Sequence, residues 1–140
     1  MHNALVFSTC TILVLLGLLH LFWAAGGKLG GAAAVPSVNG VAAFKPSKAA
    51  TIAVAAAMFS AAVVVAMAGD VIAVAAPRAL TSALALVLAT AFAARAVGDF
   101  HLVGFFKTRG DGTFAQRDTL IYSPLCLALA AVVFWIVWTR

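Results

Sequence analysis

Four long apolar segments set the strongest limit on what this chain can fold into. They run from about 4 to 24, 49 to 68, 79 to 103 and 119 to 138, and most charged residues lie between them. A helix needs about 20 apolar residues to cross the hydrocarbon core of a bilayer. The sequence therefore predicts an all-α fold: a single polytopic membrane domain over residues 1–140, with four transmembrane helices in an antiparallel bundle.

The composition supports this class and excludes two others. Of 140 residues, 65% are hydrophobic and 9% are charged, whereas soluble domains carry roughly 45–50% apolar and about 25% charged residues. The net charge of +5 does not indicate nucleic-acid binding, because the basic residues are scattered and form no stripe with interleaved aromatic residues. The two cysteines are too few for a disulfide-rich scaffold.

The first apolar segment is expected to remain in the protein as a transmembrane helix. Residues 1–3 contain no Lys or Arg, and the apolar run is longer than the roughly 7–15 residues of a signal-peptide core. A long loop, residues 25–48, then connects the first helix to the second.

The distribution of Lys and Arg predicts the orientation. The first and third gaps contain Lys28, Lys45, Lys48, Lys107, Arg109 and Arg117, whereas the opposite end has Arg78 and Arg140. Cytoplasmic loops carry an excess of basic residues. We therefore expect both long loops in the cytoplasm and both termini outside, in the inner membrane of a bacterial cell.

Polar side chains gather near the cytoplasmic ends of the expected helices. They form a candidate polar pocket of His20, Trp23, Arg95, Asp99, His101, Asp118, Tyr122 and Cys126. Polar groups at membrane depth avoid lipid by facing the protein interior. We expect His20, Asp99 and Tyr122 to meet beneath the first loop, whose apolar middle and turn-forming Gly and Pro residues predict a lid. The pocket would hold either a hydrogen-bond network with water or a ligand.

The spacing of Arg95 and Asp99 predicts an ion pair. Residues four apart share a helix face and can neutralise each other. Two alternatives remain: an ion pair that fixes the third helix to the region of Asp118, or an Arg95 side chain that extends to the lipid head groups.

No metal-binding motif is present, and the cofactor remains open. His20 and His101 lie at similar depth on different helices, an arrangement able to ligate haem, but their spacing is not specific. Cys10 and Cys126 differ in depth by roughly 10 Å, beyond the ~7 Å limit for a disulfide. Cys126 is interpreted as a packing residue, with a reactive thiol as the alternative.

Two features concern helix geometry. Pro124 lacks an amide hydrogen, so we expect a helix that begins near 118 or 119 and is kinked at Pro124. Ala53, Ala57 and Ala61 recur every four residues, which favours close packing against a neighbouring helix. That neighbour is either another helix of this chain or a second copy.

Three blocks combine these polar residues with glycines and aromatic residues. They are His20-x-x-Trp23-x-x-Gly26-Gly27, Arg95-x-x-Gly98-Asp99-Phe100 continuing to Gly104-Phe105-Phe106-Lys107, and Arg117-Asp118-Thr119 continuing to Tyr122-Ser123-Pro124-Leu125-Cys126. With these blocks the chain resembles, over nearly its whole length, a family of small bacterial integral membrane proteins catalogued as a domain of unknown function. The resemblance implies a four-helix membrane protein and carries no established activity.

Three functional hypotheses follow. The first is an accessory subunit or binding module of a membrane assembly, with membrane lipids and a larger complex or a second copy as partners. The second is a small membrane enzyme, or a binder of a cofactor or lipid head group, with its polar site at the cytoplasmic end. The third, a transporter, is disfavoured because the periplasmic half has few polar residues and no internal repeat is visible.

Overall fold

The computed structural model describes the backbone of residues 1–140 and every side chain except that of Ala32. Its elements are α1 (His2–Ala24), the 3-10 helix η1 (Gly31–Ala33), β1 (Ser37–Val38), β2 (Val41–Ala42), α2 (Lys48–Ala68), α3 (Arg78–Val97), α4 (Gly112–Arg117), the π-helical turn η2 (Asp118–Tyr122) and α5 (Ser123–Trp138). Helices α1, α2, α3 and the continuous run Gly112–Trp138 are each long and apolar enough to cross a membrane. The predicted all-α polytopic fold with four spanning helices is confirmed.

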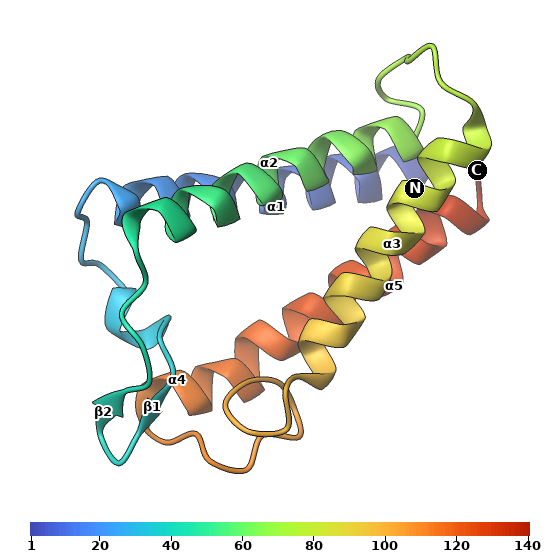
Figure 1. The fold of residues 1–140 in the computed structure, drawn as a ribbon. Coiled ribbons are helices and arrows are strands. Elements are labelled where there is room, and N and C mark those ends of the chain that lie inside the picture. The colour runs from blue at the N-terminus through green and yellow to red at the C-terminus, as the bar shows by residue number, and fades with distance from the viewer.

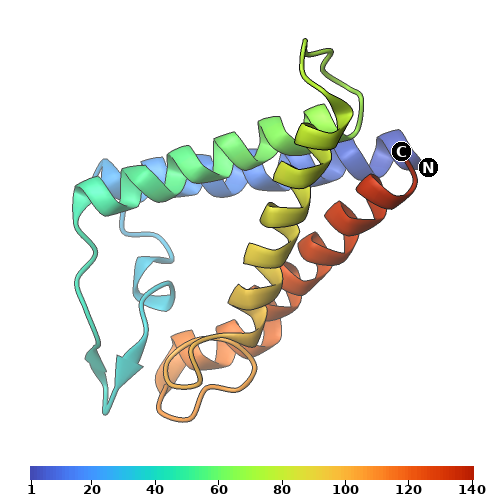
Figure 2. The same ribbon diagram turned by 45° about the vertical axis from the view of Figure 1, so that its right-hand side comes forward.

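The four long helices form two antiparallel hairpins, α1 with α2 and α3 with α5 (Figure 1). The hairpins meet at the end that holds both chain termini and the α2–α3 connection, here called the terminal end. They diverge toward the other end, here called the loop end, which holds residues 25–47 and 98–117 (Figures 1 and 2). The arrangement is antiparallel, but it is open at the loop end rather than a closed bundle.

Small residues allow α1 and α2 to approach closely. A Cβ at Gly17 would lie 2.7 Å from the ring of Phe59, and a Cβ at Gly69 would overlap the side chain of Val6. Small residues at helix interfaces let membrane helices pack without a hydrophobic driving force between them. The first hairpin is therefore held by direct van der Waals contact along its length.

The shared core lies mainly toward the terminal end. Its buried members are Val6, Leu13, Ala61, Ala62, Val65, Ala68, Ala85, Ala89, Phe92, Leu129, Ala130, Val133 and Ile136. They come from the first half of α1, the last eight residues of α2, the middle of α3 and the part of α5 from Leu129 onward. This distribution explains why the hairpins are joined there and separate farther along.

A polar cluster at the terminal end adds to this join. Arg140 donates two hydrogen bonds to Asp70, with Nε–Oδ2 3.1 Å and Nη2–Oδ1 2.7 Å, and a third to Thr81. The hydrogen bond from Arg140 also lowers the pKa of the Asp70 carboxyl group. Since Asp70 follows α2 and Arg140 follows α5, this cluster ties the two hairpins together.

Two helix boundaries differ from expectation. Helix α3 ends at Val97 rather than near 103, because Gly98 adopts a φ of 90° and turns the chain. The last helical run begins at Gly112 rather than near 118. The sequence predicts a kink at Pro124, and the turn that precedes this proline is the π-helical η2. A proline cannot donate to the carbonyl four residues earlier, and a π-turn accommodates that missing bond.

The alanine stripe of α2 is divided. Ala61 is buried in the core, whereas Ala53 and Ala57 are exposed. Packing within this chain therefore uses one end of the stripe and leaves the other end uncovered.

Candidate functional site

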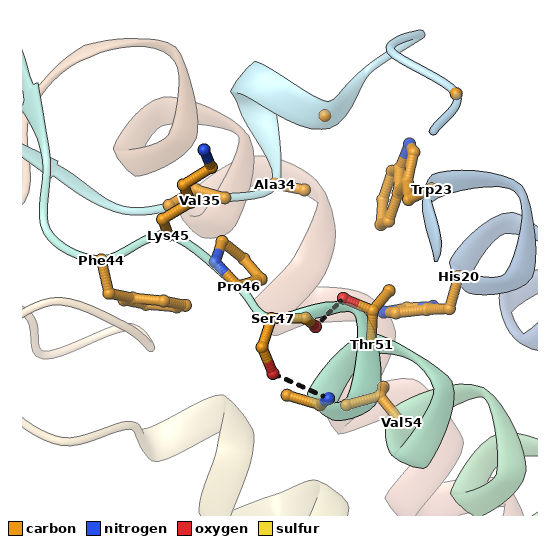
Figure 3. A pocket seen from close by; sticks show the side chains of 13 residues that line it. His20, Trp23, Ala34, Val35, Phe44, Lys45, Pro46, Ser47, Thr51 and Val54 are labelled. Carbon is orange, nitrogen blue, oxygen red and sulfur yellow. Dashed lines mark hydrogen bonds between the residues drawn. The ribbon is translucent and has the colours of Figure 1, made fainter. Parts of the chain in front are cut away.

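A pocket of about 680 Å³ lies beneath the first loop at the loop end. It is enclosed by the last turns of α1, the first turns of α2 and the loop between them (Figure 3). The lining consists of His20, Trp23, Gly27, Gly31, Ala34, Val35, Phe44, Lys45, Pro46, Ser47, Ala50, Thr51 and Val54. Most of these side chains are apolar, and a few polar groups are placed among them.

His20 and Trp23 form the α1 side of the pocket. The Nδ1 atom of His20 lies 2.7 Å from the carbonyl oxygen of Leu16, so Nδ1 carries the proton and Nε2 is left for another partner. The ring extends toward Thr51 across the pocket (Figure 3). Trp23 packs edge-on against His20, with ring centroids 5.1 Å apart, and its Nε1 donates to the Leu29 carbonyl at 2.8 Å. These bonds fix both rings.

The first turn of α2 forms the opposite side. Ser47 caps the helix: its Oγ accepts from the Ala50 amide at 3.1 Å, and its carbonyl accepts from Thr51 Oγ1 at 3.0 Å (Figure 3). The positive end of the helix dipole therefore lies at the pocket. Lys45 also belongs to the lining, with its ammonium group directed away from His20 and Thr51 (Figure 3), and no acidic side chain is found among the described lining residues.

Two contacts attach the loop to the second hairpin. The Tyr122 hydroxyl donates to the Ala33 carbonyl at 3.0 Å. Ser37 exchanges hydrogen bonds with Asp111, through its Oγ to Asp111 Oδ1 at 2.9 Å and through its carbonyl from the Asp111 amide at 3.1 Å. The Asn39-Gly40 turn, with φ of 53° and 75°, closes the β1–β2 hairpin in the manner typical of this dipeptide. The loop thus bridges both hairpins at the open end.

A second cluster surrounds the fully buried carboxylate of Asp118. Arg95 Nη2 lies 2.8 Å from Oδ1, while Lys107 Nζ at 3.1 Å and the Gly104 amide at 2.7 Å donate to Oδ2. Arg95 therefore pairs with Asp118, and the expected Arg95–Asp99 pair is wrong. The structure instead shows the alternative, an ion pair between Arg95 and the Asp118 region. Helix α3 ends at Val97, so Arg95 and Asp99 do not share a helix face.

Asp99 instead organises the turn that follows α3. Its Oδ1 accepts the amides of Val103, His101 and Leu102 at 3.0, 2.9 and 2.7 Å. These backbone hydrogen bonds lower the pKa of Asp99 to about 2, because they stabilise the ionised carboxylate. The side chain is exposed and its role is structural in this turn.

Gly98 and Gly104 lie against each other where this turn closes. A Cβ at Gly98 would overlap the Val103 carbonyl, and a Cβ at Gly104 would overlap the Val97 carbonyl. Both residues also have positive φ, 90° and 89°, which favours glycine. This close approach places the Gly104 amide where it donates a hydrogen bond to the Asp118 carboxylate.

The eight candidate residues are thus distributed over different places. His20 and Trp23 line the pocket, whereas Arg95 and Asp118 form the buried ion pair. Tyr122 holds the first loop through its hydroxyl group, and Asp99 and His101 belong to the turn after α3. Cys126 is a half-buried free thiol that packs against the core. Of the described residues that line the pocket, none is Asp99 or Tyr122. Among the described side chains, no group of three His, Cys, Asp or Glu residues is placed to hold a metal ion.

Sequence reasoning missed several residues of these sites. Lys45, Ser47 and Thr51 line the pocket, and Lys107 completes the ion cluster. A serine directly before an apolar helix is a recognisable N-cap, so Ser47 and its helix end were detectable from sequence. The approach of Lys107 to Asp118 depends on the fold of the turn between them.

A protein-family model covers most of this chain. The family model described as protein of unknown function DUF3995 matches residues 13–133. The chain belongs to this family. The matched range includes all three sequence blocks, the pocket and the Asp118 cluster. No curated protein and no solved structure matched the chain.

Proposed function

We propose that this protein is a membrane-embedded binding module whose pocket takes the head-group end of an amphipathic ligand. The pocket beneath the first loop carries this proposal. Its volume of about 680 Å³ falls within the roughly 300–1,000 Å³ of small-molecule sites, which are mostly apolar with a few placed polar groups. It also lies at the ends of α1 and α2, where the hydrocarbon core of a bilayer gives way to head groups.

The proposed setting is the inner membrane of a bacterium, with the loop end in the cytoplasm and both termini outside. The basic residues support it: Lys28, Lys45, Lys107, Arg109 and Arg117 all belong to the segments of the loop end. An excess of Lys and Arg in short loops favours the cytoplasmic side.

A role as an accessory subunit is a second proposal, supported by the exposed part of α2. Ala53 and Ala57 lie one turn apart and are uncovered in the single chain, and small residues spaced in this way admit a close neighbouring helix. A larger membrane complex or a second copy of the chain would provide that helix. Replacing Ala57 by Leu should then weaken co-purification or self-association without lowering the unfolding temperature.

The binding proposal is tested by filling the pocket. Ala50 lines it, whereas the adjacent Ala49 does not, so Ala50→Leu and Ala49→Leu form a matched pair on one helix turn. The three proteins, purified in a mild non-ionic detergent and incubated with phospholipids, are compared by native mass spectrometry. We expect the unmodified protein and Ala49→Leu to retain one phospholipid and Ala50→Leu to lose it, at equal unfolding temperatures. Equal retention by both variants, or none by the unmodified protein, would contradict the proposal.

A further inference from the structure

We infer that this pocket recognises a lipid whose head group donates hydrogen bonds through hydroxyl groups, as a glycerol head group does. The inference rests on the proposed binding function and specifies its ligand. It follows from the polar side chains of the lining, because His20 and Thr51 offer the pocket atoms that accept hydrogen bonds.

His20 and Thr51 have each used their proton inside the chain. The Nδ1 atom of His20 donates to the Leu16 carbonyl at 2.7 Å, so Nε2 has a lone pair and no proton. The hydroxyl of Thr51 donates to the Ser47 carbonyl at 3.0 Å, so its Oγ1 is left as an acceptor. Both side chains line the pocket, and the His20 ring points toward Thr51 (Figure 3). Neither acceptor receives a hydrogen bond from the described residues of the chain.

The donors next to these two side chains are also used. The amides of Ala50 and Thr51 donate to the Oγ and the carbonyl oxygen of Ser47, at 3.1 and 3.0 Å. The ammonium group of Lys45 is directed away from His20 and Thr51 (Figure 3). These surroundings disfavour a phosphate or carboxylate as the bound group, because an anionic oxygen can only accept hydrogen bonds.

A cationic donor is disfavoured by charge. No acidic side chain is found among the described lining residues, and the first turn of α2 presents the positive end of its dipole. A charge taken out of water needs an opposite charge beside it. A neutral hydroxyl needs no such partner and still donates a hydrogen bond to His20 Nε2 or Thr51 Oγ1.

The apolar walls indicate that the hydroxyl belongs to a lipid. Trp23, Val35, Phe44 and Val54 line the same pocket, and a small polyol would leave this apolar surface uncovered. The pocket also lies at the ends of α1 and α2, two helices long enough to span a membrane. A hydroxyl-bearing head group would enter the pocket there while its acyl chains remain in the bilayer.

Two lipids that differ only in their hydroxyl groups test the inference. Phosphatidylglycerol and phosphatidylpropanol of identical acyl chains carry the same charge, but the second lacks both head-group hydroxyls. The full chain, in an amine-oxide detergent that has no hydroxyl of its own, is incubated with equal amounts of both, and bound lipid is counted by native mass spectrometry. We expect about tenfold preference for phosphatidylglycerol, which corresponds to about 1.4 kcal/mol and matches one or two hydrogen bonds between neutral groups.

Variants of the two acceptors should reduce this preference. Thr51→Val removes the hydroxyl at nearly constant volume, and His20→Phe removes Nε2 while it keeps a ring beside Trp23. Each should lower the preference to about threefold or less, because one hydrogen bond is lost, and Thr51→Ser should retain it. Thr90→Val is the matched control, since Thr90 donates to the carbonyl four residues earlier at 2.8 Å, as Thr51 does, and lies outside the lining. It should leave the preference unchanged.

The ratio of the two lipids is measured on one protein sample, so a partly unfolded variant loses both lipids and keeps their ratio. Equal retention of both lipids by the unmodified protein would overturn the inference and leave the binding function standing, whereas retention of neither would contradict the binding function itself. A preference for phosphatidylethanolamine over phosphatidylglycerol in the same assay would overturn the hydroxyl in favour of an ammonium donor. Displacement of phosphatidylglycerol by equimolar glycerol would overturn the assignment to a lipid, and its persistence supports that assignment.

Discussion

Lys107 Nζ lies 3.1 Å from Asp118 Oδ2, although the two residues belong to different segments and Asp118 is fully buried. The Lys107 side chain is itself only 8% exposed and also donates to the Gly104 carbonyl at 2.9 Å. Together with Arg95, it holds the turn after α3 against the start of the last helical run. The second and third sequence blocks are therefore parts of one structural unit.

The first prediction concerns the coupling of these charges. Asp118→Asn leaves Arg95 and Lys107 without their shared anion and should lower the free energy of unfolding by about 3–5 kcal/mol. Arg95→Gln should lower the free energy of unfolding by less, because Lys107 still neutralises Asp118 and the Arg95 side chain is 35% exposed. Double-mutant cycles of unfolding in detergent measure this coupling. The losses of unfolding free energy caused by Arg95→Gln and Asp118→Asn should be non-additive when the two changes are combined. The losses caused by Arg95→Gln and Asp99→Asn should add to within about 0.5 kcal/mol. The reverse pattern would show that Arg95 pairs with Asp99.

A second prediction follows from the glycine contact. Gly98→Ala and Gly104→Ala should each destabilise the protein by about 1–3 kcal/mol or more, because each combines a positive φ with a Cβ that overlaps a backbone carbonyl. Gly31→Ala serves as the control, since no atom lies within 4 Å of its added Cβ. Thermal unfolding in detergent measures all three. If Gly98→Ala were as stable as Gly31→Ala, the close approach would not exist in solution.

Asp99 gives a third prediction, on pH. Its folded-state pKa of about 2 lies below the roughly 3.9 of an unfolded aspartate, so its contribution to stability is present above about pH 4 and is lost as the pH falls toward 2. Asp99→Ala should therefore be less stable than the unmodified protein at pH 5, and the difference should shrink as the pH is lowered to 2. Unfolding temperatures of both proteins across this range provide the measurement, and a constant difference would contradict the assigned hydrogen bonds.

The fourth prediction concerns orientation. In a background with Cys10 and Cys126 replaced by Ala, single cysteines at positions 45, 109 and 74 are labelled in whole cells by a membrane-impermeant maleimide. We expect labelling at position 74, in the α2–α3 connection, and protection at positions 45 and 109 until the cells are opened. Labelling at position 45 or 109 in intact cells would reverse the orientation.

Much of the architecture was predictable because membrane crossing is encoded locally. Length and hydropathy located all four spanning helices, whereas the eight polar residues expected in one pocket are distributed over several places. The end of α3 was placed too late because Phe100, Leu102 and Val103 extend the apolar pattern past Val97, whereas the chain turns at Gly98. Hydropathy reports the environment of a segment and does not report its φ angles.

The partner of Arg95 was harder to predict for a different reason. A four-residue spacing suggests a pair only where the helix continues, and the true partner, Asp118, is 23 residues away. The divergence of the hairpins was likewise invisible, because it depends on where the buried residues lie along α2 and α5. Such long-range relationships emerge from packing rather than from periodicity.

The divergence of the two hairpins also bears on the surrounding bilayer. In a bilayer, a body that is narrow at the terminal end and broad at the loop end (Figure 2) would occupy unequal areas in the two leaflets. Neighbouring lipids would then have to pack more loosely on one side, or the membrane would have to bend. Hydrogen bonds join Tyr122 and Asp111 to the first loop and so connect the two hairpins across this broad end. Removing them would allow the area that the protein takes up in that leaflet to change.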